Sequence, residues 1–426
     1  MPESDIGELE QISVFAEWLE LGDCSRRSLE RAGLFADALG LFNHLERVRL
    51  LGVVGSKGKG TAAIYASAAL SAGSHRVGTI TSPGLRSNRD RVRLDGSILS
   101  DRQYREMLAR IHEARSQLDL PTPNQGYLSI NGLFMLGGLE ALIRAGCEAV
   151  VLEAGIGGGS DELSLLPLDV VVMTKIFMEH RAILGPTLAA IAGDKAAVVT
   201  RRTEEVWSLG QSPEVAAEVE VRCRGVGTKL SWVNSVGGGN GELSRLPPYI
   251  RMNAIVGINA GSALSRIMDR KAIEPTALTS VLSTVFNPGR MSEHSTPFGK
   301  VIVDSAITRD ALVRCLFHFR FRFGRDPDTL LLSLPMDKDF EGFKTEAAGY
   351  SAAKVFINLP NVHLDYPSRS DWPWEWATTE RLPELLHSRG LILAVGTALF
   401  TGEVLSALNI DADSVFRPNL GGVASC

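Results

Sequence analysis

A short segment rich in glycine and lysine carries the side chains most suited to chemistry in this sequence. An apolar run, residues 48–54, ends in Gly55, Ser56, Lys57, Gly58, Lys59, Gly60 and Thr61, and an alanine-rich helical stretch follows at 62–72. Glycines let the backbone curl so that its N–H groups face an anion, and the start of a helix adds partial positive charge. Lys59 would then reach the outer phosphates of a nucleotide, and the Thr61 hydroxyl would contact phosphate or Mg²⁺.

The spacing departs from that of a strict phosphate loop, because Val53 stands where the first glycine is expected. The alternative interpretation is a glycine-rich surface turn with two solvated lysines. We expect phosphate binding, since the order strand, glycine turn, helix is the arrangement that such binding needs.

Three further polar residues each follow a predicted strand. Ser82 comes after the strand 77–81, Glu153 ends the strand 148–153, and His180 follows the strand 169–174. Because the carboxyl ends of parallel strands meet at one edge of a sheet, these side chains are expected to converge there with Lys59. Hydroxyl and carboxylate oxygens suit Mg²⁺, whereas imidazole is a less usual ligand. Separately, the three could be a capped turn, a salt bridge and a packed histidine.

After Ser82 come four arginines, Arg86, Arg89, Arg91 and Arg93, within a span of eight residues. This run could be a solvated loop or a loop that faces an anion near the nucleotide.

Predicted strands and helices alternate along the chain, which indicates an α/β fold with a parallel sheet covered on both faces. The glycine-rich segment 237–241 is predicted to be a hairpin tip, and residues 287–299 read as a linker rich in Pro and Gly. Beyond it the alternation restarts. We therefore expect an N-terminal domain, 1–289, and a smaller C-terminal α/β domain, 290–426.

Composition narrows the class of protein. The 426 residues are 45% hydrophobic and 22% charged, with a formal charge of −5, so nucleic acid is not an expected partner. We find neither a signal peptide nor an apolar run of membrane-spanning length, and the five scattered cysteines suggest neither disulfides nor zinc. A cytoplasmic protein is expected.

Seven collinear motifs resemble the folylpolyglutamate synthase/dihydrofolate synthase branch of the Mur ligase superfamily, from about residue 25 to the end. The glycine turn is similar to the branch's G-T-N-G-K-G-S, and residues 81–93 to its T-S-P-H-L…E-R-I-R loop. Residues 152–158 resemble V-E-V-G-L-G-G, and residues 179–196 resemble D-H…L-G-x-T…E-K-A-G. Residues 288–291, 336–339 and 396–404 resemble P-G-R-L/M, D-K-D and G-S-L-Y-L-x-G-E-V.

The resemblance implies a Mur-ligase-like, parallel-sheet ATPase domain that binds Mg·ATP, followed by a Rossmann-like domain that closes over it and holds an amine. The implied reaction phosphorylates a small-molecule carboxylate, and an amine attacks the acyl phosphate to give an amide, ADP and phosphate. The implied phosphate contacts are Lys59 and Thr61, and the implied magnesium ligands are Ser82, Glu153 and His180. Lys195 matches a family lysine that is often carbamylated, and Asn259 a residue that contacts adenine. Arg290 matches a linker arginine that reaches the phosphates, and Asp304 a ribose contact. A monomer or weak homo-oligomer is expected.

Departures from the family pattern cluster near the expected amine pocket. The family's D-G-A-H-N-P reads as residues 304–309 with Ile307 and Thr308 in place of His and Asn, and the tyrosine of G-S-L-Y is Leu399. Together with Arg91, these three are the candidate substrate-binding residues. A site that loses polar partners should reject a substrate that needs them. Our first hypothesis is therefore a ligase repurposed for an amine other than glutamate and possibly for an acid other than folate. The alternatives are a genuine folylpolyglutamate/dihydrofolate synthase and an inactive nucleotide-binding scaffold.

Overall fold

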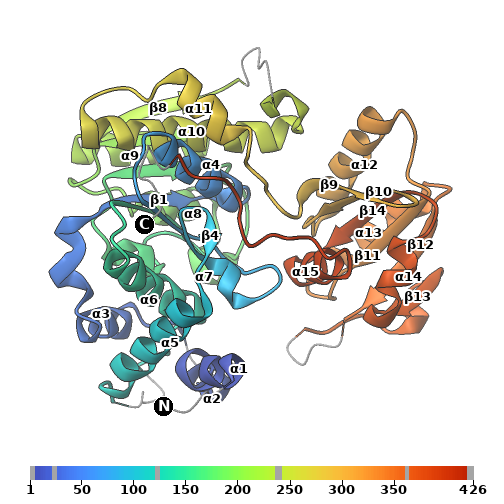
Figure 1. Ribbon diagram of the computed structural model, residues 1–426, viewed down its shortest axis with the longest axis horizontal. Coiled ribbons are helices and arrows are strands. Elements are labelled where there is room, and N and C mark those ends of the chain that lie inside the picture. Colours follow the sequence, from blue (N-terminus) through green and yellow to red (C-terminus); the bar gives the residue numbers. More distant parts are fainter. Residues whose placement is uncertain (1–4, 22–25, 120–124, 236–241, 360–363, 420–426) are drawn as a thin grey trace, which may run out of the picture. The chain divides into compact units, whose positions relative to one another are not determined.

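The computed structural model describes residues 5–21, 26–119, 125–235, 242–359 and 364–419, which form two compact units (Figure 1). Among these residues, the first unit holds 5–83, 89–285 and 413–419, and the second holds 84–88 and 286–412. This division differs from a single boundary at 289/290. The chain leaves the first unit after Val285, and residues 413–419 return to it. The segment 237–241, predicted as a hairpin tip, lies outside the described residues.

An eight-stranded sheet with the order β4-β3-β2-β5-β1-β6-β7-β8 organises the first unit. The strands β2, β5, β1, β6, β7 and β8 run parallel to one another. Strand β3 pairs antiparallel with β2, and β4 pairs antiparallel with β3. Their bounds are β1 Arg49–Val54, β2 Val77–Ile80, β3 Val92–Leu94, β4 Ser97–Ile98, β5 Ala149–Glu153, β6 Val170–Met173, β7 Glu205–Leu209 and β8 Lys229–Val233.

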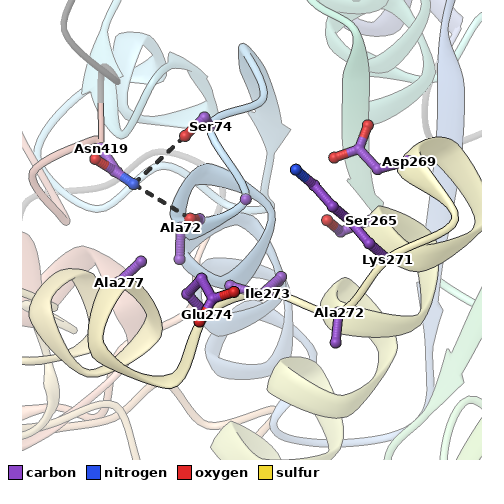
Figure 2. A pocket seen from close by; sticks show the side chains of 11 residues that line it. Ala72, Ser74, Ser265, Asp269, Lys271, Ala272, Ile273, Glu274, Ala277 and Asn419 are labelled. Carbon is purple, nitrogen blue, oxygen red and sulfur yellow. Dashed lines mark hydrogen bonds between the residues drawn. The ribbon is translucent and has the colours of Figure 1, made fainter.

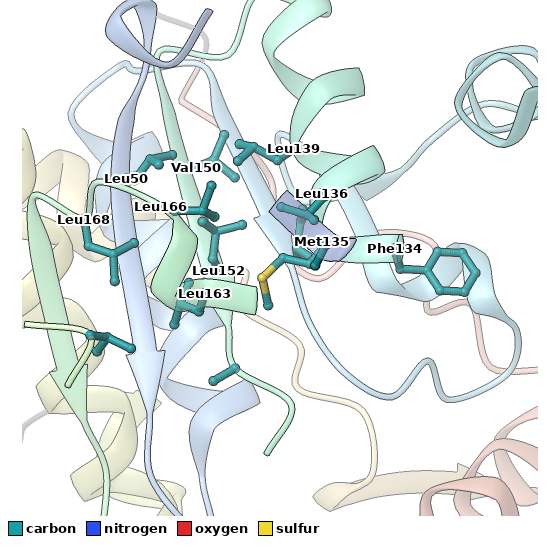
Figure 3. Close-up of a cluster of buried hydrophobic side chains, with 14 of the residues drawn as sticks. Leu50, Phe134, Met135, Leu136, Leu139, Val150, Leu152, Leu163, Leu166 and Leu168 are labelled. Atoms are coloured by element: carbon teal, nitrogen blue, oxygen red, sulfur yellow. The ribbon is translucent and has the colours of Figure 1, made fainter. Parts of the chain in front are cut away.

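Helices cover both faces of this sheet, as the alternation of strands and helices predicts. They are α1 Ile6–Glu10, α2 Ala16–Leu21, α3 Leu29–Ala38, α4 Lys59–Ala72, α5 Asp101–Ser116, α6 Ile130–Arg144, α7 Arg181–Leu184, α8 Leu188–Ala196, α9 Pro213–Val226, α10 Pro248–Asp269 and α11 Pro275–Leu282. Alternate residues of β1 face opposite sides, so Leu50 and Val54 pack with α6 while Leu51 and Val53 pack with α4 and α10. Figure 3 shows the first of these cores between β1, β5 and α6.

Helix α10 lies unusually close to α4. A Cβ atom at Gly257 or Gly261 would overlap the carbonyl oxygen of Ala62 or Ala66, so the two helices approach at glycines. This contact holds α4, whose first residue follows the glycine-rich loop, against a long partner helix.

The second unit contains a six-stranded sheet with the order β13-β12-β11-β14-β10-β9, in which only β9 is antiparallel. The bounds are β9 Arg290–Thr296, β10 Gly299–Asp304, β11 Thr329–Ser333, β12 Ala353–Asn358, β13 Glu375–Thr378 and β14 Gly390–Gly396, with helices α12 Arg309–Phe323, α13 Phe340–Ala348, α14 Leu382–Leu386 and α15 Ala398–Ala407. The linker prediction for 287–299 is wrong in part, because β9 pairs along β10 through a tight turn. The expected α/β class is confirmed in both units.

Within the described part of the chain, no helix combines the length and apolarity that crossing a membrane requires.

Candidate functional site

The glycine-rich loop has the geometry predicted for a phosphate cradle. It joins the end of β1 to α4, with Gly55 at φ +140° and Gly58, the residue before the helix, at φ +89°. A Cβ atom at Gly55 would overlap the Thr174 side chain, and one at Gly58 would overlap the Asn253 side chain. Only glycine fits both places. The first N–H groups of a helix lack partners within it, so the start of this 14-residue helix offers donors and positive potential to an anion.

Two predicted lysines meet at this loop. Lys59 Nζ donates to Gly55 O over 3.3 Å, and Lys195 Nζ donates to the same carbonyl over 3.0 Å. Lys195 is only 1% exposed, and its ammonium group forms an ion pair with Glu179 Oε1 at 2.8 Å. Burial lowers the pKa of Lys195, while the Glu179 carboxylate acts in the opposite direction. The sequence named Glu179 only as part of a motif, and its contact with Lys195 emerges from the fold.

Glu153 and Ser82 also come together, as their places after β5 and β2 predict. Glu153 is 5% exposed, and its Oε2 accepts a hydrogen bond from the Ser82 N–H over 3.0 Å. A Cβ atom at Gly60 would lie 3.3 Å from the same oxygen, so the carboxylate borders the first turn of α4. Arg91 Nη1 donates to Ser82 Oγ over 3.2 Å, and its guanidinium group lies over the Phe134 ring. Of the arginine run, Arg91 therefore reaches this edge.

His180 follows β6 and precedes α7, with an exposed side chain and φ +43°. Its neighbour Glu179 points to Lys195. The described residues contain no group of three or more His, Cys, Asp or Glu side chains arranged to hold a metal ion. Mg²⁺ nevertheless needs only one or two carboxylates when substrate phosphates supply further oxygens. The Glu153 carboxylate and the Ser82 hydroxyl lie beside the glycine-rich loop and fit that pattern, so the donor set suits nucleotide-bound Mg²⁺.

Two aspartates that the sequence did not single out hold the loop after Glu153. Asp161 Oδ2 accepts hydrogen bonds from the backbone N–H groups of Gly155 and Ile156 over 3.0 and 3.2 Å. Asp194 accepts from those of Gly158 and Ser160 over 2.8 and 3.0 Å. Burial beside Glu162 raises the pKa of Asp161 to about 7. In the sequence, the only sign of this role was that each aspartate lies close to glycine residues.

Asn253, a further residue that the sequence did not single out, lies against the glycine-rich loop at Gly58. It is buried on α10, where its Nδ2 donates to Tyr249 O over 2.7 Å and its Oδ1 finds no hydrogen-bond partner among the described residues. Asn259, the predicted adenine contact, is half-buried and lies six residues later, about one and two-thirds helical turns away. The adenine assignment of Asn259 stays a prediction.

The second unit places its predicted residues at the carboxyl edge of β10 and β14. Asp304 Oδ2 accepts from the Met291 N–H over 2.9 Å, which holds the turn that carries Arg290. Thr308 uses its hydroxyl to cap α12, and Leu399 packs against the apolar core of the unit. Thr308 therefore lacks the amide, and Leu399 the phenol group, that the family pattern has at these positions.

A cavity of about 190 Å³ lies at the opposite end of α4 from the loop. Figure 2 shows it between the ends of α4 and α10, with Asp269, Lys271 and Glu274 on its wall and the Asn419 amide bonded to Ala72 O. None of the predicted site residues lines it.

No protein-family model matches the chain. It is similar to the dihydrofolate synthase/folylpolyglutamate synthase of Escherichia coli, at 29% identity over 273 residues that cover 62% of this chain and 61% of that protein. It is also similar to the dihydrofolate synthetase of Saccharomyces cerevisiae, at 23% identity over 404 residues that cover 89% and 91%. The match to the bacterial protein thus spans about three-fifths of its length.

Solved structures share the fold. The folylpolyglutamate synthase of Thermotoga maritima superposes with a TM-score of 0.77 at 18% identity, covering 94% of this chain and 97% of that one. The Mycobacterium tuberculosis folylpolyglutamate synthase, solved with ADP and AMPPCP, gives a TM-score of 0.75 at 20% identity, covering 94% and 99%. The predicted α/β fold is therefore confirmed.

Proposed function

We propose that this chain, which belongs to the dihydrofolate synthase/folylpolyglutamate synthase family, is an ATP- and Mg²⁺-dependent ligase that forms an amide bond and releases ADP and phosphate. The observation that carries the proposal is that Lys59 and Lys195 converge on the loop before α4, while the Glu153 carboxylate borders the first turn of that helix. The names of the relatives favour a folate-type acid and a glutamate-type amine. These names support a genuine folylpolyglutamate/dihydrofolate synthase better than our first hypothesis, a ligase repurposed for other substrates.

The chemistry follows from the charges around the loop. A carboxylate is a poor electrophile, and transfer of the γ-phosphoryl group turns it into an acyl phosphate. The amine then attacks the carbonyl carbon and loses a proton as phosphate departs. Such transfers are accelerated mainly by positioning and charge neutralisation. Lys59 and the start of α4 would bind the phosphates, and bound Mg²⁺ would neutralise charge that develops on their oxygens. Glu153 and Ser82, with His180, are the residues that would hold the ion. Arg290 and Asp304 are proposed nucleotide contacts from the second unit.

One observation favours a second candidate, a ligase for an amine other than glutamate. The side chains at the family's His and Asn positions are Ile307 and Thr308, and the Thr308 hydroxyl is already used as a helix cap. Restoring both by Ile307→His and Thr308→Asn should raise ligation of glutamate if these groups are the missing recognition elements. Glutamate ligation that stays at background in the double variant would contradict this account.

Phosphate release from Mg·ATP tests the proposal, with acids and amines supplied in pairs that include dihydrofolate or a folate with glutamate. Turnover with a folate and glutamate supports the proposed function. Turnover only with another pair assigns the second candidate. If no pair is turned over while calorimetry detects bound ATP, the remaining alternative, an inactive nucleotide-binding scaffold, replaces both.

A further inference from the structure

We propose that helix α12 carries the contact surface of a weak homodimer, in which two copies of this chain meet through an exposed apolar stripe of that helix. The stripe consists of Val313, Phe317 and Phe321. All three residues belong to the second unit, so the proposal depends neither on the glycine-rich loop nor on the proposed function.

Helix α12 is apolar on two sides. Its inner side is buried in the second unit. On its outer side Phe317 is 73% exposed and Phe321 is 80% exposed, the two highest values among the large apolar side chains of the described residues, and Val313 is 38% exposed. The three recur every four residues, so they follow one face of the helix. A helix that is apolar all round is normally covered all round, which indicates a partner for the outer side.

The stripe has the size of a small protein interface. Because a phenylalanine side chain buries roughly 150–250 Å², the two rings and Val313 expose about 300–400 Å² of apolar surface on each copy. Since about 60% of an interface is apolar, covering the stripe would bury about 500–650 Å² per copy and about 1,000–1,300 Å² in total. That total lies at the lower end of specific interfaces, so the dimer should be weak and depend on protein concentration.

The charges along the stripe favour a second copy that runs in the opposite direction. Asp310 lies in the first turn of α12, and Arg320 lies in its last turn. Two antiparallel copies bring each acidic end to the basic end of the other copy, whereas parallel copies would place like charges together. Asp326 holds the Arg320 guanidinium group through Nε and Nη2, over 2.9 and 2.8 Å, so Nη1 remains for a further acceptor.

A two-fold axis near Phe317 fits the stripe. Residues at equal distances from Phe317 then lie opposite each other, so Val313 faces Phe321 of the partner subunit and the two Phe317 rings meet at the axis. Arg314 is exposed and follows Val313, so its guanidinium group reaches the face of that same ring, where the negative charge of the π-system attracts a cation. This arrangement is closed, and it therefore does not extend into a filament.

Sedimentation velocity of the full-length protein tests the dimer directly. We expect the average mass to rise from monomer towards dimer between about 1 and 500 µM, because an interface of this size gives a micromolar or weaker dissociation constant. The double variant Phe317→Ser with Phe321→Ser should raise that constant about tenfold or more. Val221→Ser, at a 62% exposed position on α9, is the matched control and should leave it unchanged. A wild-type chain that stays monomeric throughout, or a double variant that dimerises equally well, would overturn the proposal.

An exchange of charges tests the antiparallel direction. Asp310→Arg or Arg320→Asp alone places like charges together at both ends of the pair, and each should weaken dimerisation by about threefold or more. The two changes combined restore unlike charges and should recover most of the wild-type affinity. A combined variant that dimerises no better than either single variant would show that the antiparallel pairing is wrong.

A cysteine at the axis gives a covalent readout. Under mild oxidation Phe317→Cys should form a disulfide-linked dimer, because the two Cβ atoms lie close together at the axis, whereas Val221→Cys should stay monomeric. Equal amounts of linked dimer from both variants would contradict a two-fold axis at Phe317.

An anionic membrane surface is the competing occupant of the stripe. Vesicles of phosphatidylcholine and phosphatidylserine should not retain the wild-type chain in co-sedimentation. Retention that is lost in the Phe317→Ser and Phe321→Ser double variant, with a chain that stays monomeric, would replace the dimer by a membrane contact. At about 1 µM, where the dimer is dissociated, every variant should melt like the wild-type protein, because the stripe is exposed in the monomer.

Discussion

The left-handed glycine at the start of α4 offers a quantitative test of the phosphate-loop geometry. Gly58 takes φ +89°, and a Cβ atom there would overlap the Asn253 amide. In Gly58→Ala, the left-handed conformation costs roughly 1–2 kcal/mol for a residue with a Cβ atom. Displacing the buried Asn253 side chain adds about 1–3 kcal/mol, as overpacking does in other cores. The expected loss in the free energy of unfolding is therefore about 2–5 kcal/mol.

A double-mutant cycle separates the two contributions. Asn253→Ala removes the atoms that the new methyl group would meet. By itself this substitution should lower the free energy of unfolding only slightly, because the amide loses a single hydrogen bond, the one to Tyr249 O. Within that background Gly58→Ala should cost only about 1–2 kcal/mol, so the coupling between the sites should be about 1–3 kcal/mol.

Amide hydrogen exchange in α4 and β1 is the appropriate assay, because it reports the opening free energy of the first unit separately from that of the second. Calorimetry with Mg·ADP on the wild-type protein and the same variants tests whether the loop binds phosphate and whether the substitutions weaken that binding. A cost below about 1 kcal/mol for Gly58→Ala, or no coupling to Asn253→Ala, would refute the claim that glycine is required there by both φ and packing.

Three further predictions concern other parts of the first unit. Glu153→Gln should abolish phosphate release from Mg·ATP and leave the melting temperature nearly unchanged, because an amide oxygen can still accept from the Ser82 N–H; retained turnover would exclude Glu153 as a metal ligand. Phe416→Ala should destabilise the unit by about 3–5 kcal/mol, since this ring is 1% exposed, whereas the control Phe317→Ala, at 73% exposure, should change little in thermal unfolding. The pKa of Asp161 is raised to about 7, above its unfolded value of about 3.9, so its contribution to stability should be complete below about pH 4 and disappear as the pH rises through about 7. Urea unfolding across this range should show that decline in the wild-type protein and a flatter profile in Asp161→Asn.

Much of the first unit's site follows from local sequence. A buried strand, three glycines around two lysines and an alanine-rich helix predict a strand–turn–helix whose first N–H groups are open to an anion. The places of Ser82 and Glu153 also followed from sequence, because residues after neighbouring parallel strands lie at one edge of a sheet. The structure brings these two together, as expected.

Tertiary structure alone decided the partners of these residues. Glu179 meets Lys195, and Asn253 meets Gly58, across long sequence separations that no periodicity encodes. Such pairs depend on the packing of helices against the sheet, where the close approach at Gly257 fixes which residues of α10 face the loop. The same holds for residues 413–419, whose Val415 and Phe416 fill an apolar space of the first unit. Local backbone preferences act over a few residues, whereas the choice of partner is made by shape and charge after the chain has folded.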